Sequence, residues 1–105
     1  MDKDQVLEIA TRYFELVSKE LKPRKVLLFG SYARGNWHEF SDIDIAIVVD
    51  SIDGDFLDMA SMLYRLRRDI DDRIKPVLIE ESTYSSGFLE EITKYAKVLH
   101  DIGGS

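Results

Sequence analysis

Apolar residues recur at helical spacing along the first part of the chain. They stand three or four positions apart, as on one face of a helix: Val6, Ile9, Ala10, Tyr13, Phe14, Val17 and Leu21. Residues 2–5 (DKDQ) can form a start similar to a capping box, and Pro23 cannot continue a helix. The pattern therefore predicts a long amphipathic helix that ends before Pro23.

Three largely apolar segments predict strands. Residues 26–29 form a continuous apolar run, which is typical of a buried strand, and residues 42–49 form a second and longer segment that is apolar except for Asp42 and Asp44. Residues 73–79 form the third, which contains Pro76. Because proline has no N–H to donate to a ladder, we expect this strand at a sheet edge or with a bulge.

Helical spacing returns after the second and third strands. Asp53 and Asp55 mark the start of a helix that ends near Asp71, a short helix is predicted at 88–95, and a fourth strand at 97–100. The order α-β-β-α-β-α-β predicts an α/β (α+β) fold in which helices pack on a small mixed sheet of about four strands. At 105 residues we expect one domain, 1–105, with a loose tail at 103–105.

The second predicted helix has more apolar surface than one packing face needs. Four residues widen its apolar arc: Leu57, Met62, Tyr64 and Leu66. Either the first helix covers this extra surface, or a partner protein or a second copy of the chain does. Arg65, Arg67 and Arg68 near its end either complement the helix dipole at the surface or form a basic patch.

Composition narrows the functional classes. With 14 basic and 20 acidic residues the net charge is −6, so the surface field disfavours direct binding to nucleic acid. The absence of cysteine excludes disulfides and thiolate metal sites. No apolar stretch is long enough for a signal peptide or membrane span, so we expect a cytoplasmic protein without membrane contact.

Two aspartates enter the second strand with one isoleucine between them. Because side chains alternate along a strand, Asp42 and Asp44 share one face while Ile43 and Ile45 point to the core. Their Cα atoms would be roughly 6–7 Å apart, so both carboxylates could bind one divalent ion. Mg²⁺ suits such oxygen ligands, and Mn²⁺ is an alternative. The simpler reading is that Ser41 and Asp42 cap the strand and Asp44 faces water.

The loop before this strand favours the metal reading. Gly30 and Ser31 follow a buried strand, where a tight turn can offer backbone N–H groups and a hydroxyl to a phosphate, and Arg34 is a nearby cation. The loop is not a Walker A motif, because Asn36-Trp37 replaces its Lys-Ser/Thr. It also lacks the second glycine of a dinucleotide fingerprint, and no EF-hand loop fits.

Together these residues carry a family resemblance. GSYARG, a short spacer and then SDIDIAIVV resemble the GSxARG…SDxDx signature of the DNA polymerase β nucleotidyltransferase superfamily. The length and the order of elements resemble its branch of minimal nucleotidyltransferases (MNT). The motif match covers residues 30–49, and the order of elements extends it over nearly the whole chain.

The resemblance implies an activity and a site. Gly30, Ser31, Arg34 and Ser41 would bind the nucleotide phosphates, while Asp42 and Asp44 would be catalytic and would bind Mg²⁺. A hydroxyl would attack the α-phosphorus of an NTP, expected to be ATP, with pyrophosphate leaving. Minimal nucleotidyltransferases often pair with a HEPN-domain protein as antitoxin and toxin, which implies a HEPN-like partner that receives AMP.

One position departs from the family pattern. The family usually supplies a third carboxylate from the next strand, but here Lys75 stands where related sequences can have glutamate. A lysine about 5 Å from a divalent ion would oppose it by roughly 6 kcal/mol at an effective dielectric of 20. Asp71, Asp72 and Glu80 are the nearby candidates for a substitute acid.

Three functional hypotheses follow. The chain is an Mg²⁺-dependent nucleotidyltransferase that modifies a partner protein, or a binding module of the same fold that masks its partner without chemistry. Lys75 and the wide apolar arc favour the second hypothesis. Nucleotidylation of a small molecule ranks third, because the chain has no room for an additional acceptor-binding domain.

Overall fold

The predicted order of helices and strands is confirmed. A computed structural model describes residues 3–30, 33, 35, 41–52, 54–81 and 86–101, the last range by backbone alone at 86–89. The elements are α1 (Lys3–Glu20), β1 (Lys25–Phe29), β2 (Ile43–Val49), α3 (Phe56–Leu66), a 3₁₀ turn (Arg67–Asp69), β3 (Ile74–Glu80), α4 (Ser86–Thr93) and β4 (Lys97–Asp101). The predicted tail at 103–105 lies outside the described residues.

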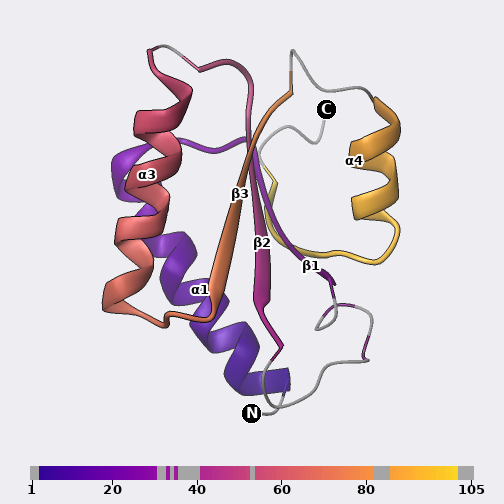
Figure 1. Cartoon of the computed structure of the whole chain (residues 1–105). Helices are drawn as coiled ribbons and strands as arrows, with labels where there is room; N and C mark the ends of the chain where they lie inside the picture. The colour runs from indigo at the N-terminus through magenta and orange to yellow at the C-terminus, as the bar shows by residue number, and fades with distance from the viewer. Residues whose placement is uncertain are drawn as a thin grey trace.

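The four strands form one mixed sheet in the order β3-β2-β1-β4 (Figure 1). The β2 strand runs parallel to β3 and antiparallel to β1, and β4 pairs antiparallel with the other side of β1. The strand with Pro76 is therefore an edge strand, as its missing N–H required. Because β2 lies between β1 and β3, its first residues lie beside both the end of β1 and the start of β3.

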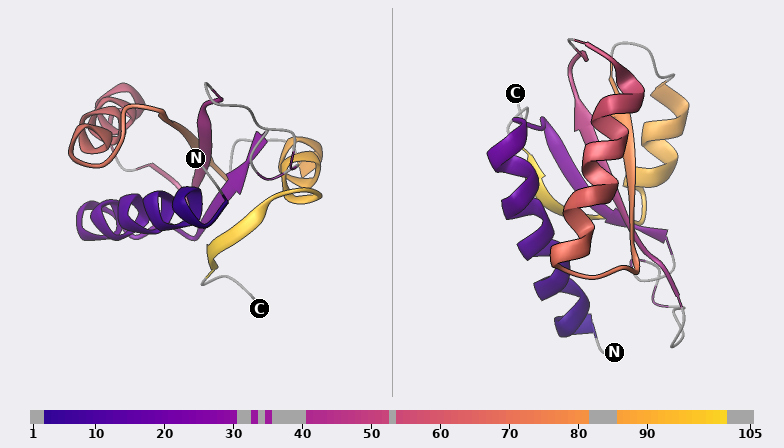
Figure 2. Two further views of the ribbon diagram at one scale, coloured as in Figure 1. Left: turned by 90° about the horizontal axis from the view of Figure 1, so that it is seen from below. Right: turned by 60° about the vertical axis from the view of Figure 1, so that its left-hand side comes forward.

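Helices cover both faces of the sheet. Figure 2 shows α1 and α3 against one face and α4 against the other. Ile43, Ile45 and Ile47 are fully buried in the core shared with α1 and α3. Ala46 and Val48, on the opposite face, are buried in a smaller cluster that includes Ile92 near the end of α4. Asp42 and Asp44 therefore belong to the α4 face of the sheet.

A buried hydrogen bond joins the two helices of the larger core. The hydroxyl of Tyr13 donates to the carbonyl oxygen of Leu63 in α3 at 2.7 Å, and the Tyr13 side chain is fully buried. Burial also raises the pKa of Tyr13, so the hydroxyl stays a donor across the physiological range. In the part of the chain that the structure describes, no helix is long and apolar enough to cross a membrane.

Replacing Tyr13 by phenylalanine is expected to lower the free energy of unfolding by about 1 kcal/mol, because the bond to Leu63 is lost without changing the packed ring. Urea denaturation followed by circular dichroism measures this. Tyr64→Phe is the matched control, since Tyr64 is 42% exposed and the same change there is expected to have no measurable effect. Equal stability of Tyr13→Phe and wild type would contradict the assigned bond.

Candidate functional site

Asp44 lies at the centre of three strands. It pairs with Phe29 of β1 on one side and with Lys75 of β3 on the other. Its side chain is half-buried, whereas Asp42, one residue before the strand, is exposed and Ile43 between them is fully buried. The predicted alternation is therefore present, with both carboxylates on the α4 face. Ser41, just before them, is buried.

Gly30 brings the loop and the aspartate pair together. Its φ angle is +73°, a region that residues with a Cβ rarely adopt. A methyl group on Gly30 would overlap Oδ2 of Asp44 and would lie 2.9 Å from its Cγ. Glycine is thus needed for the backbone angle and for contact with the carboxylate. Ser31 and Arg34, the other predicted phosphate ligands of this loop, lie outside the described residues.

The electrostatic setting of Asp44 favours a cation. Burial raises the pKa of Asp44, the positive charge of Lys75 lowers it, and the negative charge of Asp42 raises it again. Two carboxylates close enough to repel, one of them half-buried, are most stable as anions when a cation lies between them. Carboxylate oxygens together with ligand phosphates are the usual donor set for Mg²⁺. The residues present therefore fit one divalent ion.

Lys75 occupies the side of this site where a third carboxylate would complete it. Residues paired in a parallel ladder share a face, so Lys75 projects on the same face as Asp44. It is exposed and close enough to lower the pKa of Asp44. Among the described residues no group of three or more His, Asp or Glu side chains could hold a metal. The site therefore has two carboxylates and one ammonium group.

The candidate substitute acids are positioned for other contacts. Asp71 accepts bonds from the Arg73 guanidinium at 2.7 and 3.0 Å. Glu80 pairs with Val49, at the far end of the strands from Asp44, and accepts from the N–H of Ile52 at 2.5 Å. Asp72 is exposed in the turn before β3. Within the described ranges none of the three joins Asp42 and Asp44 in a metal-binding group.

The ion pair of Asp71 makes a pH-dependent contribution to stability. The hydrogen bonds from Arg73 hold the pKa of Asp71 below its usual value. An acid with a lowered folded-state pKa stabilises the fold above its unfolded pKa, and this contribution is lost as the pH falls through the folded-state value. We expect Asp71→Asn to reduce stability by about 0.5–1 kcal/mol at pH 7. The difference from wild type should shrink steadily in urea titrations below pH 4, and a constant difference would contradict this.

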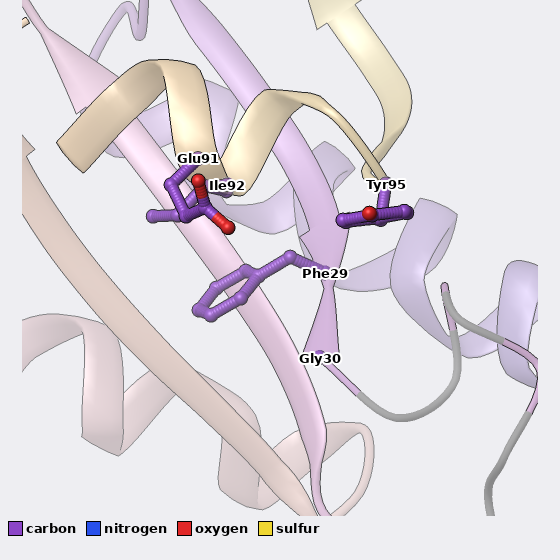
Figure 3. A pocket seen from close by; sticks show the side chains of 5 residues that line it. All are labelled: Phe29, Gly30, Glu91, Ile92 and Tyr95. Atoms are coloured by element: carbon purple, nitrogen blue, oxygen red, sulfur yellow. The ribbon is translucent and has the colours of Figure 1, made fainter. Parts of the chain in front are cut away.

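The structure also places a pocket beside the aspartates that sequence reasoning missed. It is lined by Phe29, Gly30, Glu91, Ile92 and Tyr95 and has a volume of about 270 Å³ (Figure 3). The sequence showed residues 88–95 only as a short helix. Glu91 and Tyr95 are four residues apart, but only the packing of α4 beside β1 turns this spacing into one wall of a pocket.

Comparisons with known proteins show which family the chain resembles. The family model for the polymerase β nucleotidyltransferase domain matches residues 13–102. The protein named "Putative protein adenylyltransferase MJ0141" of Methanocaldococcus jannaschii is 33% identical over 98 residues, which cover 87% of this chain and 95% of that protein. A second protein of the same organism with the corresponding name, MJ0604, is 59% identical, but over only 34 residues, 32% of this chain and 33% of that protein.

Solved structures share the fold at low sequence identity. A crystal structure described as that of "a putative nucleotidyltransferase from Sulfolobus solfataricus" superposes with a TM-score of 0.69 at 21% identity, covering 98% of this chain and 86% of that one. A toxin–antitoxin structure with AMP-PNP gives 0.62 at 24%, covering 89% and 74%. The tri-AMPylated Shewanella oneidensis HEPN toxin in complex with its MNT antitoxin gives 0.59 at 20%, covering 90% and 72%. Since the family model matches most of its length, the chain belongs to the polymerase β nucleotidyltransferase family.

Proposed function

We propose that this protein is an Mg²⁺-dependent adenylyltransferase that transfers AMP from ATP to a hydroxyl group of a partner protein. The observation that carries the proposal is the contact of Gly30 with Asp44, on the face that also carries Asp42. The names of the curated relatives support the adenylyl group and the protein acceptor. The AMPylated HEPN toxin bound to an MNT antitoxin supports a HEPN-like partner.

The chemistry that this arrangement supports is an in-line substitution at phosphorus. The acceptor hydroxyl oxygen forms a bond to the α-phosphorus of ATP, the bond to the bridging oxygen breaks, and pyrophosphate leaves while the hydroxyl proton passes to solvent. A bound Mg²⁺ would neutralise charge on the phosphates. Asp42 and Asp44 would hold that ion, and Gly30, which has no side chain, lets the Asp44 carboxylate lie against the start of the loop that would bind the phosphates.

In the proposed reaction, Lys75 slows the transfer of AMP. Its charge stabilises the ionised form of Asp44 and opposes a divalent ion in the same place. The side chain is long and exposed, so it can turn toward solvent or toward a phosphate when the ion and ATP bind together. We therefore expect transfer to need higher Mg²⁺ concentrations than a site with three carboxylates would.

The test follows label from ATP labelled at the α-phosphorus onto a protein partner. The chain is produced together with the product of the adjacent gene, and transfer is measured with Mg²⁺ and separately with Mn²⁺. We expect a labelled partner band that disappears when the metal is chelated. Absence of label with a stably bound partner under both metals would overturn the proposal.

A second candidate function is masking of a partner by contact alone, and the surface of α3 favours it. Part of the wide apolar arc is covered, because Met62 and Leu66 are partly buried and pack against the larger core. Leu57 nevertheless remains 71% exposed, and Phe56 and Tyr64 are partly exposed beside it. A groove next to Leu57 and Tyr64 is lined by Arg65, Arg67 and Arg68. This surface suits an apolar partner face with acidic residues around it.

One of the arginines that line this groove, Arg67, already forms contacts within the chain. Arg67 donates to the carbonyl oxygens of Asp72 and Ile74 at 3.0 and 2.9 Å and stacks over the Tyr64 ring at 4.9 Å.

The Asp44→Asn variant separates the two candidate functions in cells. If this variant still neutralises the partner, contact through α3 is the function. Loss of neutralisation in that variant would assign the effect to AMP transfer.

A further inference from the structure

The pocket between α4 and the end of β1 opens directly beside the proposed phosphate site. Figure 3 shows the Phe29 and Tyr95 rings and the Glu91 carboxylate bordering it, with Gly30 at its edge. Gly30 is the residue whose Cα lies against the Asp44 carboxylate. A molecule bound at Asp44 could therefore extend past Gly30 into the pocket without crossing a strand.

The lining of the pocket selects against phosphate and in favour of a neutral ring. Phe29, Ile92 and Tyr95 provide apolar and aromatic surface, and among the described lining residues Glu91 alone carries a charge at neutral pH. A carboxylate repels the oxygens of a triphosphate but accepts hydrogen bonds from amino and hydroxyl groups. Lys94 donates to one oxygen of Glu91 at 3.4 Å, and both side chains are more than 60% exposed, so this pair is weak.

The volume points to part of a nucleotide. Pockets that enclose a whole drug-sized ligand have volumes of roughly 300–1,000 Å³, and this one measures about 270 Å³. It can therefore hold one fragment while the rest of the ligand lies elsewhere. The triphosphate has its own place at Gly30 and Asp44 in the proposed function, which leaves the nucleoside as the fragment to be accommodated.

We propose that this pocket is the nucleoside subsite, where the base stacks on Tyr95 and the nucleoside donates a hydrogen bond to Glu91. This inference rests on the proposed function, because it takes an NTP as the substrate. Stacking on an aromatic ring tolerates any base, whereas the carboxylate of Glu91 favours bases that carry an exocyclic amino group over uracil. The pocket would thus add to the affinity for the nucleotide. It would also supply a preference among bases, which the triphosphate site does not contact.

The test compares the binding of ATP with that of inorganic tripolyphosphate, both with Mg²⁺, by calorimetry. Tripolyphosphate has the phosphates but no nucleoside, so only ATP reports on the pocket. We expect Tyr95→Ala to weaken ATP binding about tenfold and to leave tripolyphosphate binding unchanged, while Tyr95→Phe keeps ATP binding. Tyr64→Ala is the matched control, since it removes a similarly exposed ring from α3 and should change neither.

The second variant tests the role of Glu91. Wild type is expected to bind ATP more tightly than UTP, and Glu91→Gln is expected to reduce this preference because the charged acceptor is lost. Equal binding of ATP and UTP by wild type would remove Glu91 from base recognition and overturn that part of the proposal.

The outcomes separate this inference from the proposed function. If wild type binds ATP and Tyr95→Ala binds it equally well, the subsite is wrong while the nucleotidyltransferase proposal stands. If Tyr95→Ala binds ATP normally but transfers AMP poorly to the partner, the pocket receives the acceptor side chain and the nucleoside assignment is also wrong. If wild type binds neither ATP nor tripolyphosphate, both proposals fail together.

Discussion

Replacing Asp44 by asparagine is expected to abolish AMP transfer while leaving the fold intact. Residues that only orient a metal ligand typically contribute 10–100-fold to affinity or activity, so loss of a ligand itself should reduce transfer by more than about a hundredfold. Stability should not fall, because burial raises the pKa of Asp44. At pH 7 its charged form is therefore unfavourable in the folded state, and a neutral amide of the same shape removes that penalty.

The matched control is Asp50→Asn. Asp50 directly follows the same strand, is exposed, and binds Arg24 at 2.6 Å on the protein surface. The same chemical change there is expected to leave transfer unaltered and to reduce stability slightly. Radiolabel transfer and urea denaturation of both variants give the two readouts. Wild-type transfer by Asp44→Asn would remove the aspartate pair from the reaction.

The features that the sequence predicted well are those that follow from a regular spacing or from one residue type within a single element. Alternation along 42–49 predicted the buried isoleucines and the two outward aspartates, and both are present. Pro76 predicted an edge strand from its missing N–H, and β3 is one. Boundaries were less accurate: the α-helix predicted to end near Asp71 ends at Leu66 and continues as a 3₁₀ turn to Asp69. Asp55 caps it by accepting from the N–H of Leu57.

The site required information that no local pattern contains. The contact between Gly30 and Asp44 depends on the register of β1 against β2, and the position of Lys75 depends on the register of β2 against β3. The pocket depends on where α4 packs, which is set by Ile92 against the small cluster on the second face. The sequence predicted only that the isoleucine side faces the core, whereas Ala46 and Val48 on the opposite face are buried as well.

Replacing Lys75 by glutamate is expected to raise AMP transfer at least tenfold and to lower the Mg²⁺ concentration needed. The variant would place a third carboxylate beside Asp44 on the same face, where the lysine now opposes a divalent ion by several kcal/mol before screening. Transfer rates measured over a range of Mg²⁺ concentrations test this. Lys75→Gln separates the two causes, because it removes the opposing charge without adding a ligand and should give a smaller gain.

The Lys75→Glu substitution should also destabilise the protein when no metal is present, because Lys75 balances part of the negative charge of the two aspartates. Its positive charge lowers the pKa of Asp44 and so offsets the repulsion from Asp42, which makes it an internal counter-charge for the pair. With glutamate there, three carboxylates would repel, and the melting temperature should fall without Mg²⁺ and recover with it. Lys97→Glu, an equal charge change at an exposed position of β4, should show no such recovery. If Lys75→Glu instead reduced transfer, the ammonium group would have to act on the phosphates, and Lys75 would be part of the reaction and not an obstacle to it.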